Sequence, residues 1–226
     1  MRRLLFLMTF GLMGAGILIS LGVWQVQRLA WKQDLLARIE AQINAAPVSL
    51  AEATTPEFRR YAPVKIVGTF GLDHEYLSAL ASRRNTGAVY RIIRPFEVEG
   101  YGRILVDTGW VRDGIDVPGV SLERLSLLGN LDAPNEVDGF TPAPEIDTNI
   151  WFARDVLAMA EVLNTQPIMV VLRDAPEIDL GVTPWPVDTA GIPNDHLQYA
   201  ITWFSLAAIW VLMTAYFVLR TNRSPR

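Results

Sequence analysis

Two long apolar segments constrain the fold of this chain more than any other feature. Residues 4–23 form a run of 20 residues without a charge, and residues 197–219 form a run of 23. An α-helix rises about 1.5 Å per residue, so either run can cross the hydrocarbon core of a bilayer, which is about 30 Å thick. We therefore expect transmembrane helices over 4–24 and 197–219, and one domain over 25–195 between them.

The first apolar segment has the length of a permanent anchor rather than that of a signal peptide. Its uncharged run exceeds the usual core of about 7–15 residues in signal peptides, and no A-x-A cleavage site follows it. Small side chains on both segments favour close packing of the two helices. The packing residues expected are Gly11, Ala15, Leu18 and Gly22 on the first segment and Ala200, Ala207, Ala208 and Ala215 on the second.

Arginines at the outer ends of the two segments predict the topology. They are Arg2, Arg3, Arg220, Arg223 and Arg226. Residues 25–195 carry the other 15 basic residues and all 24 acidic residues, a net charge of −9. By the positive-inside rule, both termini are expected in the cytoplasm and the central domain outside it. No organellar transit peptide is expected before residue 4, so the simplest setting is a bacterial inner membrane with a periplasmic domain.

The central domain has the sequence pattern of a β-rich fold. Short runs rich in β-branched and aromatic residues, separated by Gly, Asp or Asn, predict strands within 61–70, 75–82, 88–100, 102–111, 121–131 and 167–175. Consecutive strands at this spacing favour an antiparallel sheet or barrel. The fold class expected is thus a membrane protein of the α+β class, with two transmembrane helices bracketing one exported domain that has one or two helices.

Helical spacing appears in two parts of the central domain. Residues 33–43 extend the first helix as an amphipathic helix, and residues 154–164 predict a second helix with Val156, Leu157, Ala160 and Leu163 on its buried face. Residues 45–56 are expected to be a link, and residues 133–148, with three prolines, an irregular loop. Val106, Trp110 and Val170 are expected in or near the core.

The chain lacks the sequence motifs of the common catalytic sites. There is no G-x-S-x-G, H-E-x-x-H, Walker loop or G-x-G-x-x-G. The chain has no cysteine, which excludes disulfides, thiolate catalysis and thiolate metal sites. His74 is the only histidine of the central domain, in a polar turn typical of plain surface. The acidic domain also excludes nucleic acid as a partner.

The start of the second apolar segment holds the other histidine. Pro193, Asn194 and Asp195 suit a helix start, which places His196 in the first turn at the membrane surface. One helical face then carries His196, Tyr199, Trp203, Leu206 and Trp210. This face suits a flat ligand that is partly polar and partly apolar. The alternative is an interfacial aromatic belt with His196 as a helix cap.

The exit of the first helix carries a similar group. Trp24, Arg28 and Trp31 lie on one side of it at spacings of four and three. Aromatic anchors with a snorkelling cation explain this pattern without a ligand.

Three motifs resemble those of the Surf1/Shy1 family, in the same order and over almost the whole chain. LGVWQVQRLAWK (21–32) resembles its G-x-W-Q-x-x-R-x-x-W-K, VDTGWVRDG (106–114) its R-G-W-V segment, and NDHLQYAITW (194–203) its N-N-H-L-x-Y-A-x-T-W. Two positions depart from the pattern. Thr108 stands where the family has an arginine, so any role of that arginine is in doubt, and Asp195 replaces an asparagine, which can cap a helix equally well.

The resemblance implies a non-enzymatic factor for the assembly of haem-copper oxidases of the aa3 type. It implies that the protein binds haem a as transient cargo and helps deliver it to oxidase subunit I, with haem a synthase as a further partner. The histidine that matches His196 is the expected iron ligand. Tyr199, Trp203 and Trp24 would then lie against the macrocycle and its isoprenoid tail, and Arg28 would meet a propionate.

Two other function classes remain open at this point. One is a membrane-anchored scaffold that holds subunit I or haem a synthase without binding haem. The other is an enzyme acting on a lipid or haem substrate, which the missing catalytic motifs disfavour. Bound haem in the purified protein would separate the carrier from the scaffold, and a defined turnover would restore the enzyme.

Overall fold

The computed structural model describes residues 2–175 and 179–223, and it divides into two compact units. The first contains 1–38 and 189–226, and the second contains 39–188. Arg226, one of the arginines behind the topology prediction, lies outside the described residues.

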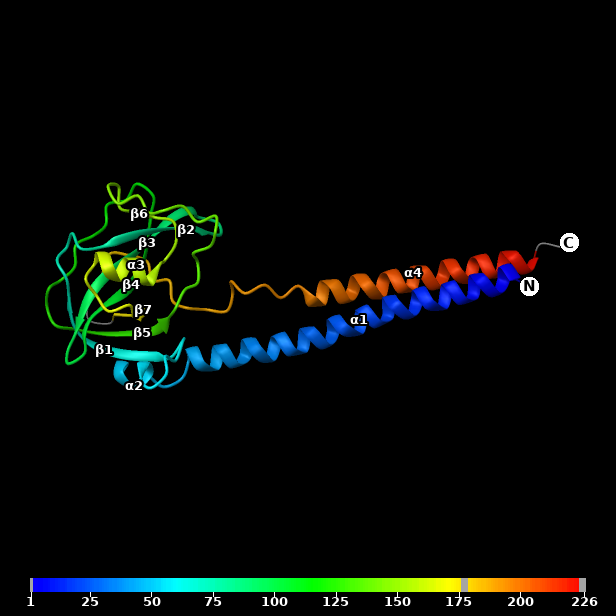
Figure 1. Cartoon of the computed structure of the whole chain (residues 1–226), viewed down its shortest axis with the longest axis horizontal. Coiled ribbons are helices and arrows are strands. Elements are labelled where there is room, and N and C mark those ends of the chain that lie inside the picture. The colour runs from blue at the N-terminus through cyan, green and yellow to red at the C-terminus, as the bar shows by residue number, and fades with distance from the viewer. Residues whose placement is uncertain (1, 176–178, 224–226) are drawn as a thin grey trace. The chain divides into compact units, whose positions relative to one another are not determined.

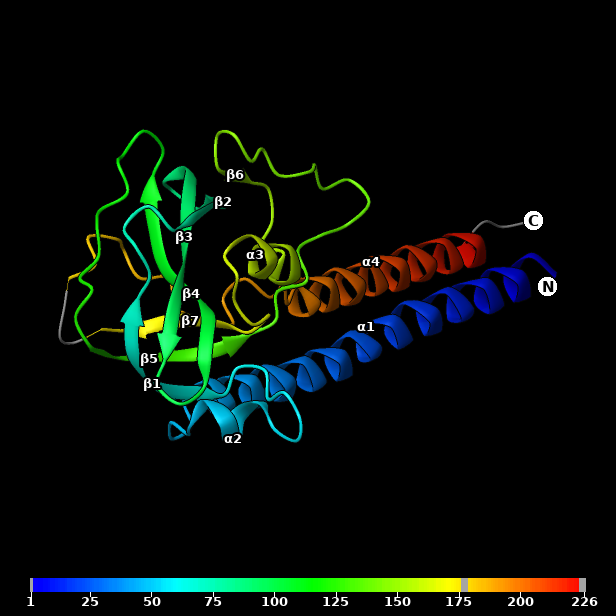
Figure 2. The same cartoon turned by 60° about the vertical axis from the view of Figure 1, so that its left-hand side comes forward.

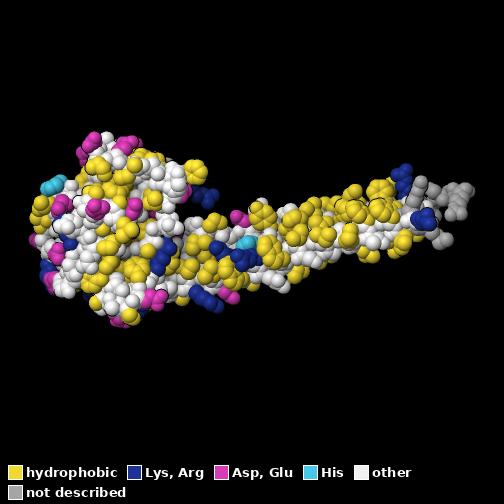
Figure 3. Space-filling view, in the orientation of Figure 1, with side chains coloured by type: hydrophobic (Ala, Val, Ile, Leu, Met, Phe, Trp, Pro, Cys, Tyr) yellow, Lys and Arg dark blue, Asp and Glu magenta, His cyan; other side chains and the backbone are white. Residues whose placement is uncertain are grey.

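The first unit consists of α4 (His196–Arg223) and of α1 (Arg2–Ile43) up to residue 38. The two helices run antiparallel and side by side (Figures 1 and 2). Both are long and apolar enough to cross a membrane. Only 11% of the most apolar window of α1 and 6% of that of α4 is buried, so neither has the covered surface of a core helix. Hydrophobic side chains accordingly line the face of the pair seen in Figure 3. Two apolar helices bracketing a domain were predicted, and this is confirmed.

Along the contact between the two helices, which we call the seam, glycines of α1 lie against side chains of α4: Gly11 against Thr214, Gly14 against Trp210 and Gly22 against Phe204. Gly11, Ala15 and Gly22 are buried, as predicted, and so are Ala200 and Ala207. The prediction was wrong for two further alanines, which are exposed: Ala208 and Ala215. The inward positions of α4 repeat every seven residues, as Ala200 and Ala207 show. Ala208 and Ala215 each lie one residue beyond such a position, so they point about 100° away from the seam.

The second unit is built on a mixed sheet, whose strands are β1 (Pro63–Phe70), β2 (Leu77–Arg83), β3 (Gly87–Val98), β4 (Gly102–Arg112), β5 (Leu125–Asp132), β6 (Ile150–Trp151) and β7 (Met169–Asp174). The spatial order among the described residues is β1-β5-β7-β4-β3-β2-β6, and a further pairing of β1 with β3 closes five strands into a barrel. Strand β3 makes this closure possible by changing partner. Residues 87–93 pair with β2, and residues 96–98 pair with β1.

The expected antiparallel sheet is found for most pairs, but β4–β7 and β2–β6 are parallel. Residues 133–168 cause this difference, because they carry the chain from β5 across the domain before β7 begins. Such a crossover allows parallel pairing, whereas a hairpin enforces antiparallel pairing. Two short elements were also not predicted, β6 and helix α2 (Leu50–Thr54), which begins inside the expected link with Ser49 as its N-cap.

Two apolar clusters hold the domain together. The first fills the barrel and includes Ile104, Val106 and Val170, and the second lies between the sheet and helix α3 (Val156–Val162) and includes Leu105. Strand β4 thus buries alternate residues on both of its faces. Within α3 the expected buried face was wrong in one residue: Leu157 is 72% exposed, while Met159 is fully buried.

Candidate functional site

The beginning of α4 places His196 against α1. The backbone carbonyl of Asp195 accepts the amide hydrogen of Tyr199, so the helix starts at the predicted point. The imidazole Nδ1 of His196 lies 2.8 Å from the side-chain Oε1 of Gln25. Gln25 is 8% exposed, and His196 is half-buried. A polar contact therefore lies between the two helices at the point where the apolar segment of α4 begins.

The contact with Gln25 defines which imidazole nitrogen carries the proton. An amide oxygen only accepts hydrogen bonds, so Nδ1 is the donor, and in the neutral imidazole Nε2 then carries the lone pair. Within the part of the chain that the structure describes, His196 has no second hydrogen-bond partner. A neutral imidazole with a free Nε2 is the form that binds a metal ion.

The predicted aromatic residues lie to one side of this contact. In antiparallel helices that face each other through Gln25 and His196, the 3.6-residue period puts Trp24 and Arg28 on the same flank as Tyr199 and Trp203. Tyr199 and Trp24 are 55% and 53% exposed, and Trp203 is half-buried. Much of the aromatic surface on this flank is therefore not covered by packing and is accessible to a ligand.

Arg28 lies over the indole of Trp31, 3.9 Å from the ring centroid. This stacking orients the guanidinium and leaves its N–H edge available to an anion. Next to His196, the side-chain oxygen of Asn194 is buried and has no hydrogen-bond partner among the described residues. The site thus combines one metal-binding nitrogen, aromatic surface, one cation and one unpaired acceptor.

The VDTGWV segment in the barrel domain has a structural role instead. Gly109 has φ +133°, and a Cβ there would come within 2.3 Å of the carbonyl oxygen of Thr183. Trp110 is 7% exposed, which confirms its predicted place in the core. Thr108, at the position of the family arginine, is fully buried and donates a hydrogen bond to the carbonyl of Ile92 at 2.9 Å.

A buried charge network includes Asp107 of this segment. The carboxylate of Asp107 is fully buried and accepts hydrogen bonds from Arg91 at 2.6 Å and from Arg154 at 3.2 Å. Arg154 also pairs with Glu136. Burial favours a raised pKa for Glu136, but the hydrogen bonds and the charge of Arg154 outweigh burial and lower that pKa. The charges are paired with one another, which indicates a structural network.

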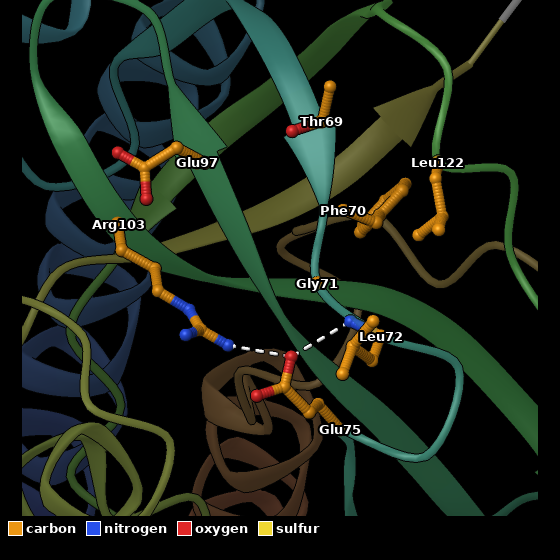
Figure 4. A pocket seen from close by; sticks show the side chains of 8 residues that line it. All are labelled: Thr69, Phe70, Gly71, Leu72, Glu75, Glu97, Arg103 and Leu122. Atoms are coloured by element: carbon orange, nitrogen blue, oxygen red, sulfur yellow. Dashed lines mark hydrogen bonds and ion pairs between the residues drawn. The ribbon is translucent and has the colours of Figure 1, made fainter.

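An open pocket of about 290 Å³ in the barrel domain has its polar groups engaged in a similar way (Figure 4). Glu75 Oε2 meets the guanidinium of Arg103 at 2.9 Å and accepts the amide hydrogen of Leu72 at 2.8 Å. The hydrogen bond from Arg103 lowers the pKa of Glu75. The neighbouring His74 is exposed, as predicted.

Comparison with known proteins identifies the family. A sequence model described as the SURF1 family matches residues 12–208. The SURF1-like protein of Rickettsia felis is 31% identical over 215 residues, which cover 91% of this chain and 93% of that protein. The chain belongs to the SURF1 family.

Vertebrate members of the family are similar over most of the chain as well. Surfeit locus protein 1 of Xenopus tropicalis is 31% identical over 84% of this chain and 68% of its own length. The human protein of that name is 29% identical over 84% of this chain and 70% of its own length. SURF1 proteins are known as cytochrome c oxidase assembly factors, which agrees with the expected function class.

The structure brings the first and third SURF1 motifs of this chain together, while the middle motif lies in the barrel domain. Of the five residues predicted to bind the cofactor, α4 carries His196, Tyr199 and Trp203. Helix α1 carries the other two, Trp24 and Arg28. Gln25 was not predicted as part of the site. It directly follows Trp24 in the first motif, and its burial among apolar seam residues is visible only in the folded helix pair.

Proposed function

We propose that this SURF1-family protein is a haem a carrier that assists delivery of haem a to subunit I of an aa3-type oxidase. The observation that carries the proposal is the hydrogen bond from His196 Nδ1 to Gln25, which in the neutral imidazole leaves the lone pair on Nε2. Haem iron in proteins takes such an imidazole as an axial ligand.

The residues around His196 suit the other parts of haem a. Tyr199, Trp203 and Trp24 offer aromatic surface to the macrocycle and the isoprenoid tail. Arg28 offers a positioned guanidinium to a propionate, since arginine binds carboxylates through its planar N–H edge. When bound, the haem supplies the iron that His196 would ligate. A single imidazole ligand suits a carrier, because the cargo must leave again.

We place this site at the outer surface of a bacterial inner membrane, with the barrel domain in the periplasm and both termini in the cytoplasm. The arginines near both chain ends and the acidic central domain support this arrangement. Haem a synthase would be the donor and subunit I the acceptor, and both are membrane-embedded proteins that could meet the helix pair within the bilayer.

A membrane scaffold that holds subunit I or haem a synthase without binding haem is the second candidate. The same hydrogen bond favours it, since a Gln–His contact alone can hold two transmembrane helices together. The absorption spectrum of the protein purified from cells that make haem a separates the two. A stoichiometric Soret band that is absent from protein made in cells without haem a supports the carrier, and a haem-free protein that still copurifies with subunit I supports the scaffold.

A further inference from the structure

We infer that Gln25 is a positioning residue that fixes the tautomer and the orientation of His196 for iron binding. This inference rests on the proposed haem function. The seam of α1 is otherwise lined by Gly11, Ala15, Leu18 and Gly22, so an amide with 8% exposure is out of place there unless it has a partner. Its partner is the imidazole, and the contact joins residues 171 positions apart in the chain.

The tautomer of His196 depends on which atom of the Gln25 amide faces the imidazole. With Oε1 of Gln25 at 2.8 Å from Nδ1, the proton is held on Nδ1 and the lone pair is on Nε2. If the amide nitrogen faced the ring, Nδ1 would be the acceptor and Nε2 would carry the proton, which blocks iron binding. Histidine ligands in metalloproteins generally need such a second hydrogen bond to hold ring and tautomer.

The kind of acceptor also sets the strength of the ligand. A carboxylate next to Nδ1 makes the imidazole more basic and the iron bond stronger. A neutral amide orients the ring without adding that charge. Gln25 therefore gives an oriented ligand of moderate strength, which suits a protein that must pass its haem on.

Two substitutions at one position test this role. Gln25→Leu removes the acceptor while keeping a side chain of similar size, and we expect it to weaken haem a binding roughly 10–100-fold. Gln25→Glu keeps an acceptor and adds a charge. We expect it to retain haem, to lose it more slowly to apomyoglobin, and to lower the iron midpoint potential. Gln27→Leu is the matched control, because Gln27 is exposed and points about 200° away from Gln25 on the same helix.

A crosslink separates positioning from helix packing. The chain has no cysteine, so Gly11→Cys with Thr214→Cys reports directly on the seam, where a Cβ at Gly11 lies 3.0 Å from Cβ of Thr214. If Gln25 positions His196, Gln25→Leu should crosslink like the parent. Its haem binding should fall, and the resonance Raman signal of the iron–histidine bond should shift.

Three results would contradict the positioning role of Gln25, and each would have a different meaning. Parent-like haem binding and an unshifted iron–histidine signal in Gln25→Leu would overturn the positioning role and leave the haem proposal standing, provided that His196→Ala loses its haem. Loss of both crosslink and haem in Gln25→Leu would make Gln25 a packing residue. Full haem with a parent spectrum in His196→Ala would overturn the haem site and this inference with it.

Discussion

The indole Nε1 of Trp210 donates a hydrogen bond to the backbone carbonyl of Gly11 at 3.0 Å, across the seam of the helix pair. The ring lies over Gly14, where an added Cβ would come within 2.5 Å of it. Glycine thus allows a tryptophan of α4 to reach the backbone of α1, in the manner of small-residue contacts between membrane helices.

A bulky side chain in place of Gly14 is therefore expected to separate the two helices. Gly14→Ile should remove most of the crosslink between Gly11→Cys and Thr214→Cys, because the side chain would occupy the space of the indole. Gly16→Ile is the matched control, since a Cβ at Gly16 meets nothing within 4 Å. Equal crosslinking in the two variants would show that the helices do not pack through Gly14.

The predicted topology is testable with reporters. A reporter active only outside the cytoplasm should work when fused at Ala46 and fail after Arg226, because the arginines near both chain ends favour the cytoplasm. A cytoplasmic reporter at the same two points should give the opposite pattern. Export of the C-terminal reporter would contradict the proposed placement of the barrel domain.

Trp110 should stabilise the barrel domain and have no direct contact with haem. Replacing this buried ring by Ala is expected to cost about 3–5 kcal/mol in the free energy of unfolding. Phe140→Ala is the control in the same domain, because Phe140 is 95% exposed and should change stability by less than about 0.5 kcal/mol. Thermal unfolding of the full chain measures both. A Trp110→Ala protein with parent stability but without haem would show that Trp110 has been misassigned.

Acid should weaken the charge network at Glu136. Its pKa is lowered in the folded protein by Arg154, despite burial, so its contribution is present above the unfolded-state pKa of about 4.3 and is lost as the pH falls through the folded-state pKa. Glu136→Gln should therefore be less stable than the parent at pH 7, and the difference should shrink below about pH 4. The exposed Glu123→Gln is the control. A difference that stays constant from pH 7 to pH 3 would contradict this account.

Local sequence patterns predicted most of the fold because they act over a few residues. The run predicted within 88–100 corresponds to β3 (Gly87–Val98), and that within 102–111 to β4 (Gly102–Arg112). Gly100 in the turn and Gly102 at the start of β4 both have positive φ. The parallel pairing of β4 with β7 could not be read in this way. Strand partners across a crossover depend on how the whole domain closes, not on the strands themselves.

The candidate site was predicted only in part, because contacts between the two helices cannot be read from either segment alone. The motif around His196 and the helical period identified the histidine and its aromatic flank, because both lie within two turns of one helix. Gln25 was missed because a polar residue at a helix exit is typical of the membrane interface, and only the antiparallel pairing shows that it meets His196. The exposed Ala208 and Ala215 were misplaced for the same reason, since composition does not reveal which face meets the partner helix.

The most direct test of the central claim compares His196→Ala with the parent, both purified from cells that make haem a. Within the described residues, the hydrogen bond of His196 is to Gln25. Losing that bond together with any capping of α4 should cost about 1–3 kcal/mol, so the variant should still insert and fold. We predict loss of most of the bound haem and a shifted Soret band in what remains. Equal haem content with an unshifted Soret band would contradict iron ligation by His196 and leave the scaffold as the better account of the protein.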